Sequence, residues 1–463
     1  MKTDYSSDYQ LFTQKKNKKD TPNNQDLEED SYTVWSVQHQ VRQWWRRDAA
    51  KKQSTEGSIP AGYALLLQLV VHDLTWSPDY GNITADQKDH SLRTLDLRTL
   101  YGSTYRGTPK VDSFKLGFGE NPMEPDLPRT AKGTPQVGDI RNTYSVPMAQ
   151  LTLGFLQFHN HMVENLQNAP EHLQNNLSAR QTVQWHYEWI ILNDLLPRLC
   201  GKPIESLWTD YRTWRRDQSA LNQPTGSLGV LLKTPLLRIL LGLQKNRYRL
   251  NEPLQFIRMM SDHGNIPLYT PVISKNRNKK DSLKLKANEK LPPFWSIQWD
   301  LWLQGNPKGL YCPMFELNNL NINSGYQPYP QYSTHQLVQE SIKQDARIGI
   351  DNGKSIAEQY GIFQHPSIPE QAPLWYYILA EAEESANGQH LGPLGSRLLS
   401  RYLLSLLDRN PHAHIHAESP WVPSFSSHAQ EAKEYGQNYQ LQDLFQYAGM
   451  PITHQDVKEL LCL

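Results

Sequence analysis

The first long apolar stretch of the chain runs from Gly62 to Trp76, and its length and composition predict a helix. Three polar residues, Gln68, His72 and Asp73, interrupt it. Gln68 and His72 are four positions apart and share one helix face, whereas Asp73 lies about 100° round the axis from His72. Buried polar side chains need partners. The pattern therefore indicates either core residues with satisfied hydrogen bonds or a functional site.

Several later segments have the same apolar, helix-length character, while the alternation typical of strands is rare and brief. The predicted helices cover residues 146–166, 179–199, 231–243, 373–408 and 440–447. The predicted fold class is therefore mainly α.

The N-terminal residues differ from the rest of the chain. Residues 1–31 are polar and predict a disordered or loosely attached arm. Residues 35–52 interleave tryptophans with arginines and lysines, a pattern that suits either a peripheral membrane contact or packing of the tryptophans on the body. We expect an N-terminal arm over 1–58, one large helical domain over 59–450 and a C-terminal tail over 451–463.

Charge and cysteine content limit the choice of function. Lys plus Arg and Asp plus Glu both number 47, so no net charge attracts the chain to nucleic acid. The three cysteines, Cys200, Cys312 and Cys462, lack metal-ligand spacing and fit a reducing compartment. Neither a signal peptide nor a transmembrane segment is predicted. These features predict a cytoplasmic protein.

Five blocks, in order along the chain, resemble the animal-type haem peroxidases (the peroxidase–cyclooxygenase superfamily), in the form found in bacteria. The matching blocks are Gln68–Asp73, Leu95–Ser103, Gly138–Asn142 with Phe158–Asn160, Trp185–Trp189 with Leu196–Gly201, and Pro373–Glu383 with Leu391–Arg397. The resemblance covers residues 60 to 450 or so and implies a single large helical domain that holds haem.

The resemblance also implies roles on the distal side of a haem. His72 would move the proton of hydrogen peroxide, Gln68 would help to hold water, and Arg141 would stabilise charge as the O–O bond breaks. Arg141 has a structural alternative, a buried ion pair at a helix start, with Asp139 as the expected partner.

The proximal side departs from the family pattern. The anchor Tyr248–Asn251 matches, with Arg238 upstream, but the position of the iron-ligating histidine is Leu241. No histidine lies between positions 186 and 263, so a small shift of the alignment does not supply one. The positions of the residue that orients the ligand and of a propionate partner are Ser341 and Gln344. The resemblance thus implies haem, and the altered proximal residues argue against it.

A calcium site of the family is altered as well. Asp73 and Asp96 match two of its carboxylate ligands, but Arg98 and Leu92 stand at two other ligand positions. A guanidinium can replace a cation by pairing with carboxylates. Our hypothesis is that Arg98 bridges Asp73 and Asp96 in place of calcium.

Three functions follow as alternatives. The first is a degenerate peroxidase that acts as a binding or regulatory partner of another protein, such as an active paralogue or a pathway enzyme. The second is an active but atypical haem-dependent oxidoreductase in which pocket contacts or His72 hold the haem. The third is an oxygenase that acts on a lipid, with residues 35–52 at the membrane.

Overall fold

The computed structural model of the chain describes residues 56–74, 95–102, 114, 116–118, 124–131, 133, 135–143, 145–168, 178–221, 243, 247–252, 265–267, 290–291, 295–304, 311–313, 350–370, 372–423 and 438–460. Within these ranges the secondary structure is mainly helical with short strands, which confirms the mainly α class predicted from the sequence. Among the described residues, no helix is both long and apolar enough to cross a membrane.

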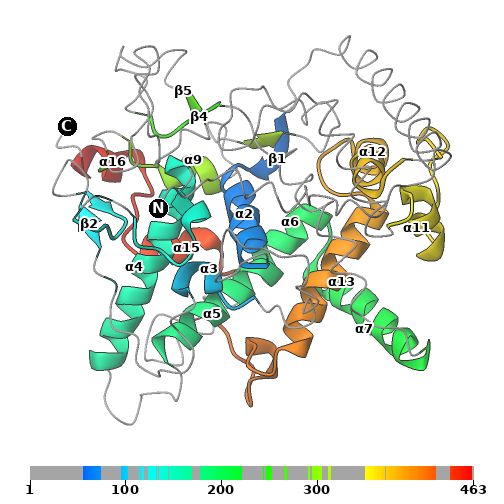
Figure 1. Cartoon of the computed structure of the whole chain (residues 1–463), viewed down its shortest axis with the longest axis horizontal. Helices are drawn as coiled ribbons and strands as arrows, with labels where there is room; N and C mark the ends of the chain where they lie inside the picture. Colours follow the sequence, from blue (N-terminus) through cyan, green and yellow to red (C-terminus); the bar gives the residue numbers. More distant parts are fainter. Residues whose placement is uncertain are drawn as a thin grey trace, which may run out of the picture.

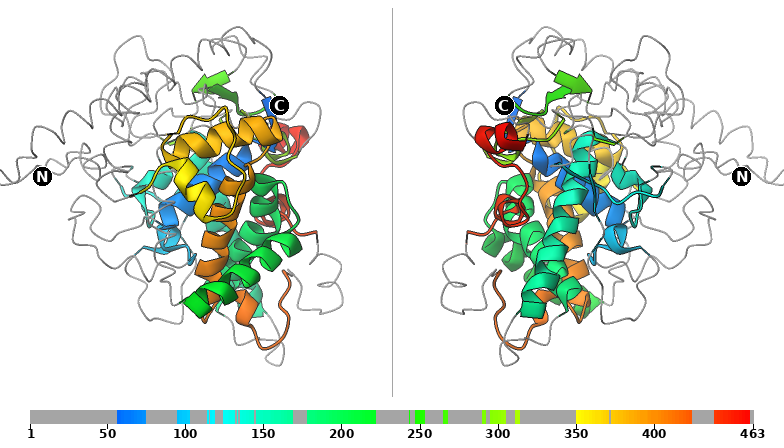
Figure 2. Two further views of the ribbon diagram at one scale, coloured as in Figure 1. Left: turned by 90° about the vertical axis from the view of Figure 1, so that its right-hand side faces the viewer. Right: turned by 90° about the vertical axis from the view of Figure 1, so that its left-hand side faces the viewer.

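Helix α2 (Gly62–Leu74) lies near the centre of the described body (Figures 1 and 2). All 13 of its residues are buried, as expected of a helix that is apolar on nearly every face. Its start packs closely on α9 (Trp299–Leu303), because a Cβ atom on Gly62 would lie 2.8 Å from the carbonyl oxygen of Trp302. The polar residues of α2 are therefore held inside the core.

Helix α4 (Val146–Asn168) packs against both α2 and α5 (Ala179–Ile190). The α5 helix begins at Ser178, whose hydroxyl oxygen accepts a hydrogen bond from the backbone N–H of Gln181 at 3.2 Å. This is an ordinary N-terminal cap, and it fixes where α5 begins beside α4.

The helical course continues from α5 through a π-helical turn, η6 (Ile191–Leu195), into α6 (Leu196–Cys200). Pro197 accounts for the wider turn, because proline has no N–H to donate to the carbonyl four residues earlier. The helix predicted over 179–199 is therefore one course with a π-turn inside it. It ends at Gly201, whose φ of 60° lies in the left-handed region.

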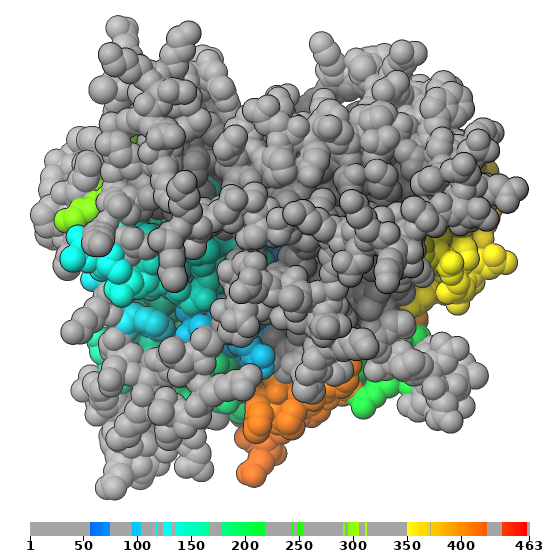
Figure 3. All heavy atoms as spheres, in the orientation of Figure 1, coloured from blue at the N-terminus to red at the C-terminus, as the bar shows by residue number. Residues whose placement is uncertain are grey.

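Helix α7 (Ile204–Leu221) packs against α13 (Pro393–Arg409), and the two are joined by Arg401 Nε, which lies 2.7 Å from Asp210 Oδ2. In the space-filling view, the bright green surface of α7 lies just to the right of the orange surface of the segment that includes α13, near the bottom of the molecule (Figure 3). After α13 the chain forms the short 3-10 helix η9 (His414–His416). This corner of the fold contains a pocket.

The block predicted as helical over 373–408 is divided into two helices, α12 (Leu374–Ala386) and α13. The chain turns at Asn387 (φ 49°) and Gly388 (φ 69°). Buried Glu381 of α12 then accepts hydrogen bonds from the backbone N–H groups of Leu394 and Gly395 at 2.8 and 3.2 Å. Its carboxylate thus satisfies the N-terminus of α13.

The remaining elements are short. The helices are α3 (Arg98–Tyr101), η4 (Ile140–Thr143), α11 (Gly353–Gln359), α15 (Leu441–Tyr447) and α16 (His454–Leu460). The antiparallel strand pairs are β1 (Glu56–Pro60) with β6 (Tyr311–Pro313), β2 (Gly117–Phe118) with β3 (Pro125–Asp126), and β4 (Arg247–Arg249) with β5 (Asn265–Pro267).

Several sequence predictions can be placed on this fold. The helix predicted over 440–447 is α15, with Gln440 as its cap. The arm boundary at residue 58 falls within β1, and the tail 451–463 contains α16. Cys200 and Cys312 are buried, and their thiols contact the carbonyl oxygens of Ser396 at 3.7 Å and Pro60 at 3.5 Å. The predicted helix 231–243, apart from Leu243, and the segment 35–52 lie outside the described residues.

Candidate active site

The polar residues of α2 lie at its C-terminal half and are buried. Gln68, His72 and Asp73 retain 8%, 6% and 4% of their surface exposed. Gln68 lies one turn before His72 on the same helix face, as the sequence predicted. His72 and Asp73 contact different groups, which come from α3 and η4.

The His72 imidazole is held by a short chain of hydrogen bonds. Its Nδ1 atom lies 2.8 Å from Oδ1 of Asn142, and Nδ2 of Asn142 donates to the carbonyl oxygen of Thr99 at 3.1 Å and to the Thr99 hydroxyl at 3.0 Å. A carbonyl only accepts, so Asn142 presents its own oxygen to His72, and Nδ1 must carry the imidazole proton. The neutral ring therefore keeps its lone pair on Nε2.

The pKa of His72 agrees with this neutral form. Burial, followed by the nearby charge of Arg141, lowers the pKa of His72 to about 4, although Asp139 and the hydrogen bond with Asn142 act in the opposite direction. At neutral pH the ring is uncharged, and Nε2 can accept a proton or bind a metal ion. A buried neutral imidazole in one fixed tautomer has the chemistry of a general base.

Two groups among the described residues, Asp139 and the His72 carbonyl, bind Arg141 beside this imidazole. Its Nε lies 3.0 Å from Asp139 Oδ1, its Nη2 lies 2.6 Å from Asp139 Oδ2, and Nη2 also donates to the carbonyl oxygen of His72 at 2.8 Å. Burial disfavours ionisation of Asp139, but the charge and hydrogen bonds of Arg141 outweigh this and keep the pKa of Asp139 below its usual value. The ion pair with Asp139 expected as the structural alternative is therefore formed.

Asp73 is held by backbone groups of the segment that leads into α3. Its carboxylate accepts hydrogen bonds from the N–H of Leu97 at 3.0 Å and of Thr99 at 3.3 Å. Burial, and then the charge of Asp96, raise the pKa of Asp73 well above its usual value. Leu97 adopts a left-handed conformation with φ 54°, which points to a constrained turn at this position.

Arg98 forms an ion pair with Asp96, with Nε 2.7 Å from Oδ2. Its charge also favours ionisation of Asp73, but no hydrogen bond between Arg98 and Asp73 accompanies those from the backbone N–H groups of Leu97 and Thr99 within the described part of the chain. The structure thus shows the Asp96 half of the expected bridge. The described residues contain no group of three or more His, Cys, Asp or Glu side chains arranged to hold a metal ion.

The proximal positions are mostly not described. Leu241, Ser341 and Gln344 lie outside the described residues. The anchor that follows Leu241 is described, with Tyr248 buried and its ring centre 5.0 Å from that of Trp302. The side-chain amide of Asn251 donates to the carbonyl oxygen of Ser296 at 2.6 Å. This anchor is therefore part of the core.

The donor set on the α2 side can be tested for its fit to a haem. Nε2 of His72, with its lone pair fixed by the Asn142 contact, suits an axial ligand or a base at an iron. The Arg141 guanidinium is already paired with Asp139. Among the described residues of this site, the atom suited to haem iron is therefore Nε2 of His72, so the fit is limited to one face of a haem.

Sequence reasoning missed two residues of this site. Asn142 and Thr99 orient His72, yet neither was assigned a role. Their positions in the sequence could have indicated a role, because Asn142 directly follows Arg141 and Thr99 lies in the block that contains Asp96.

Comparison with known proteins gives likenesses at low identity. No protein-family model matches the chain, and no curated protein does. Among solved structures, peroxidase A from Dictyostelium discoideum aligns over 87% of both chains with 11% identity and a TM-score of 0.49. A fatty acid alpha-dioxygenase from Oryza sativa aligns over 87% of this chain and 75% of its own, with 12% identity and a TM-score of 0.47. At these TM-scores the likeness carries no inference about function.

Proposed function

We propose that this protein is a haem-peroxidase-like protein of the bacterial type that has lost ordinary peroxidase turnover and serves as a binding or regulatory partner of another protein. Leu241, at the expected axial-ligand position, offers no atom that could bind iron. Without an axial imidazole, a bound iron would lose both its anchor and the electron donation that assists O–O cleavage.

The observation that carries this proposal is the pairing of Arg141. In a peroxidase reaction the guanidinium must stabilise charge that develops on the peroxide. Here Asp139 neutralises that guanidinium through two parallel contacts at 3.0 and 2.6 Å, and the His72 carbonyl takes a further N–H. A cation already paired with a buried carboxylate adds little charge stabilisation to a neighbouring group. Arg141 is thus better suited to holding α2 and η4 together.

The alternative is an active, atypical haem-dependent peroxidase or oxygenase that uses hydrogen peroxide or O2. The neutral, oriented imidazole of His72 favours it, because this ring can act as a base or as an iron ligand. If bound, haem would supply the redox-active iron, and His72 is the described residue that would hold it. Oxygenation of a lipid belongs to this alternative, with residues 35–52 as the expected membrane contact.

Haemin titration separates the two functions. The purified chain is titrated with haemin while the Soret band is followed, and peroxide-dependent oxidation of guaiacol is then assayed for wild type, His72→Ala and the control His412→Ala. His412 is exposed, so its replacement tests for a general effect of losing a histidine.

We expect no guaiacol oxidation above that of free haemin, whether or not haem binds. One equivalent of haem together with oxidation that His72→Ala abolishes and His412→Ala leaves intact would refute the proposed loss of turnover and establish the alternative. If no haem binds, the alternative and its lipid form fail together.

A further inference from the structure

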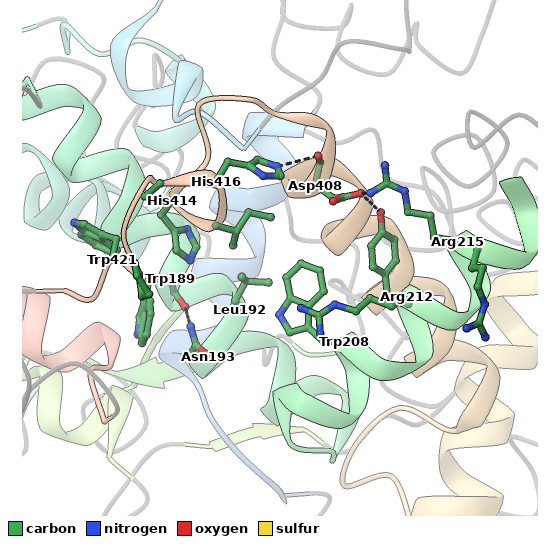
Figure 4. A pocket seen from close by; sticks show the side chains of 15 residues that line it. Trp189, Leu192, Asn193, Trp208, Arg212, Arg215, Asp408, His414, His416 and Trp421 are labelled. Carbon is green, nitrogen blue, oxygen red and sulfur yellow. Dashed lines mark hydrogen bonds and ion pairs between the residues drawn. The ribbon is translucent and has the colours of Figure 1, made fainter.

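A pocket of about 780 Å³ lies at the corner formed by the end of α5 with η6, helix α7 and the segment from η9 to Trp421 (Figure 4). It shares no lining residue with the His72 site. Its volume is within the range of pockets that enclose a small organic molecule. Its lining combines two features, a row of arginines and a set of aromatic rings.

The arginines come from one face of α7. Arg212 and Arg216 are four positions apart, and Arg215 is adjacent, so all three lie on the side of the helix that lines the pocket. Asp408 is the single acidic residue among the described lining residues. It pairs with Arg215 and also accepts a hydrogen bond from the Tyr211 hydroxyl at 2.8 Å. Arg212 and Arg216 therefore have no ion-pair partner among the described residues that line the pocket.

These two charges are available to a ligand. The Arg212 guanidinium carbon lies 5.3 Å from the ring centre of Trp208, and Arg212 forms no ion pair with the described residues. Arg216 has a side chain 79% exposed, and its contact is a distant one, 3.9 Å from its neighbour Asp217. Like charges four residues apart on a helix repel each other. An anion between them would relieve this repulsion.

The opposite wall is aromatic. The ring of Trp421 has its centre 6.2 Å from that of Trp189 and 5.7 Å from that of His414. Figure 4 shows these rings on one side of the pocket, Trp208 and Arg212 on the other, and Leu192 between them. Among the described residues, the buried indole N–H of Trp189 has no hydrogen-bond acceptor.

We propose that this pocket binds a small aromatic acid. The carboxylate pairs with Arg212 and Arg216, which present planar donor forks suited to it. The aromatic body lies against the indole rings of Trp208 and Trp421. The competing explanation is that these arginines are ordinary solvated side chains of a surface helix and bind nothing.

The test uses a matched pair of probes, 2-naphthoate and its uncharged analogue 2-naphthol, titrated into the full-length chain by isothermal calorimetry. The variants are Arg212→Gln with Arg216→Gln, and Trp421→Ala. The control Lys202→Gln removes an exposed positive charge just before α7 that does not line the pocket. Circular dichroism of each variant checks that it is folded, which is expected for the arginine variants because both side chains are at the surface.

We expect 2-naphthoate to bind at one site and 2-naphthol to bind at least about tenfold more weakly, as the loss of a charge-assisted pair implies. The double arginine variant should lose about tenfold in 2-naphthoate affinity, Trp421→Ala should also weaken binding, and Lys202→Gln should match wild type. Affinity should decrease with added salt, since the arginines are exposed. Absence of 2-naphthoate binding, equal affinity for both probes, or an equal loss in Lys202→Gln would overturn the proposal.

Discussion

Acid should destabilise this protein in part through His72, and the substitution His72→Gln should remove that part. The imidazole is buried and neutral, and its pKa is lowered from 6.5 to about 4. The unfolded chain therefore binds a proton at a higher pH than the folded chain does. The contribution of neutral His72 is complete above pH 6.5 and is lost progressively as the pH decreases towards 4, below which the folded form is protonated as well.

The size of the effect follows from these two pKa values. Integration of the proton linkage between pH 7 and pH 5 gives a loss of roughly 2 kcal/mol in the free energy of unfolding from this one residue. The full effect, reached near pH 4, is about 3 kcal/mol, since each pKa unit corresponds to about 1.4 kcal/mol. A glutamine at position 72 does not titrate, so the variant should lack this pH dependence.

Urea unfolding followed by tryptophan fluorescence at pH 7 and pH 5 measures the effect. Wild type, His72→Gln and the exposed control His412→Gln are compared. His159 and His186 also have a pKa lowered to about 4 by burial, but they titrate equally in all three proteins and cancel in the difference. If wild type and His72→Gln lose the same free energy of unfolding between the two pH values, the buried neutral His72 inferred from the Asn142 contact is wrong.

Three further outcomes are expected. Asp194→Asn should lower the free energy of unfolding, measured by urea titration, by about 3 kcal/mol or more. The buried carboxylate of Asp194 accepts hydrogen bonds from a tyrosine hydroxyl, an arginine and the first backbone N–H of α15. The control Asp217→Asn, at an exposed position, should change the free energy of unfolding by less than about 0.5 kcal/mol. Gly154→Ala should cost about 1–3 kcal/mol in the same assay, because the added Cβ would lie 2.6 Å from the Phe445 ring. Elemental analysis of the purified chain should find no stoichiometric calcium, and one tightly held calcium per chain would refute the replacement of calcium by Arg98.

Periodicity and composition were enough to predict the helices that are buried in the hydrophobic core. The apolar run of α2 predicts burial directly, and all of the helix is buried. The break between α12 and α13 was missed because Asn387 and Gly388 are common in both turns and helix ends, and the division depends on left-handed backbone at both positions. The π-turn of η6 was missed for a similar reason, since one proline also occurs in ordinary first turns.

The sequence was enough to predict which residues form the site. It was not enough to predict the contacts between those residues. The sequence places His72 and Arg141 far apart, and the resemblance supplied their proximity. Which group orients His72 depends on how η4 packs against α3, and no spacing within the sequence encodes that Asn142 donates to Thr99. The pocket beside α7 was missed because its aromatic wall and its arginines come from three separate segments.

The geometry also changes what the polar residues of α2 imply. From sequence alone, Gln68, His72 and Arg141 supported an active enzyme because they had no evident structural reason to occur together. The structure supplies such a reason for two of them, since neighbouring residues of η4 hold the His72 backbone through Arg141 and its ring through Asn142. Loss of either contact would leave a buried polar group without its partner, at a cost of about 1–3 kcal/mol. The contacts of His72 and Arg141 therefore account for their presence, whereas Gln68 and the Nε2 atom of His72 are the features that still support catalysis.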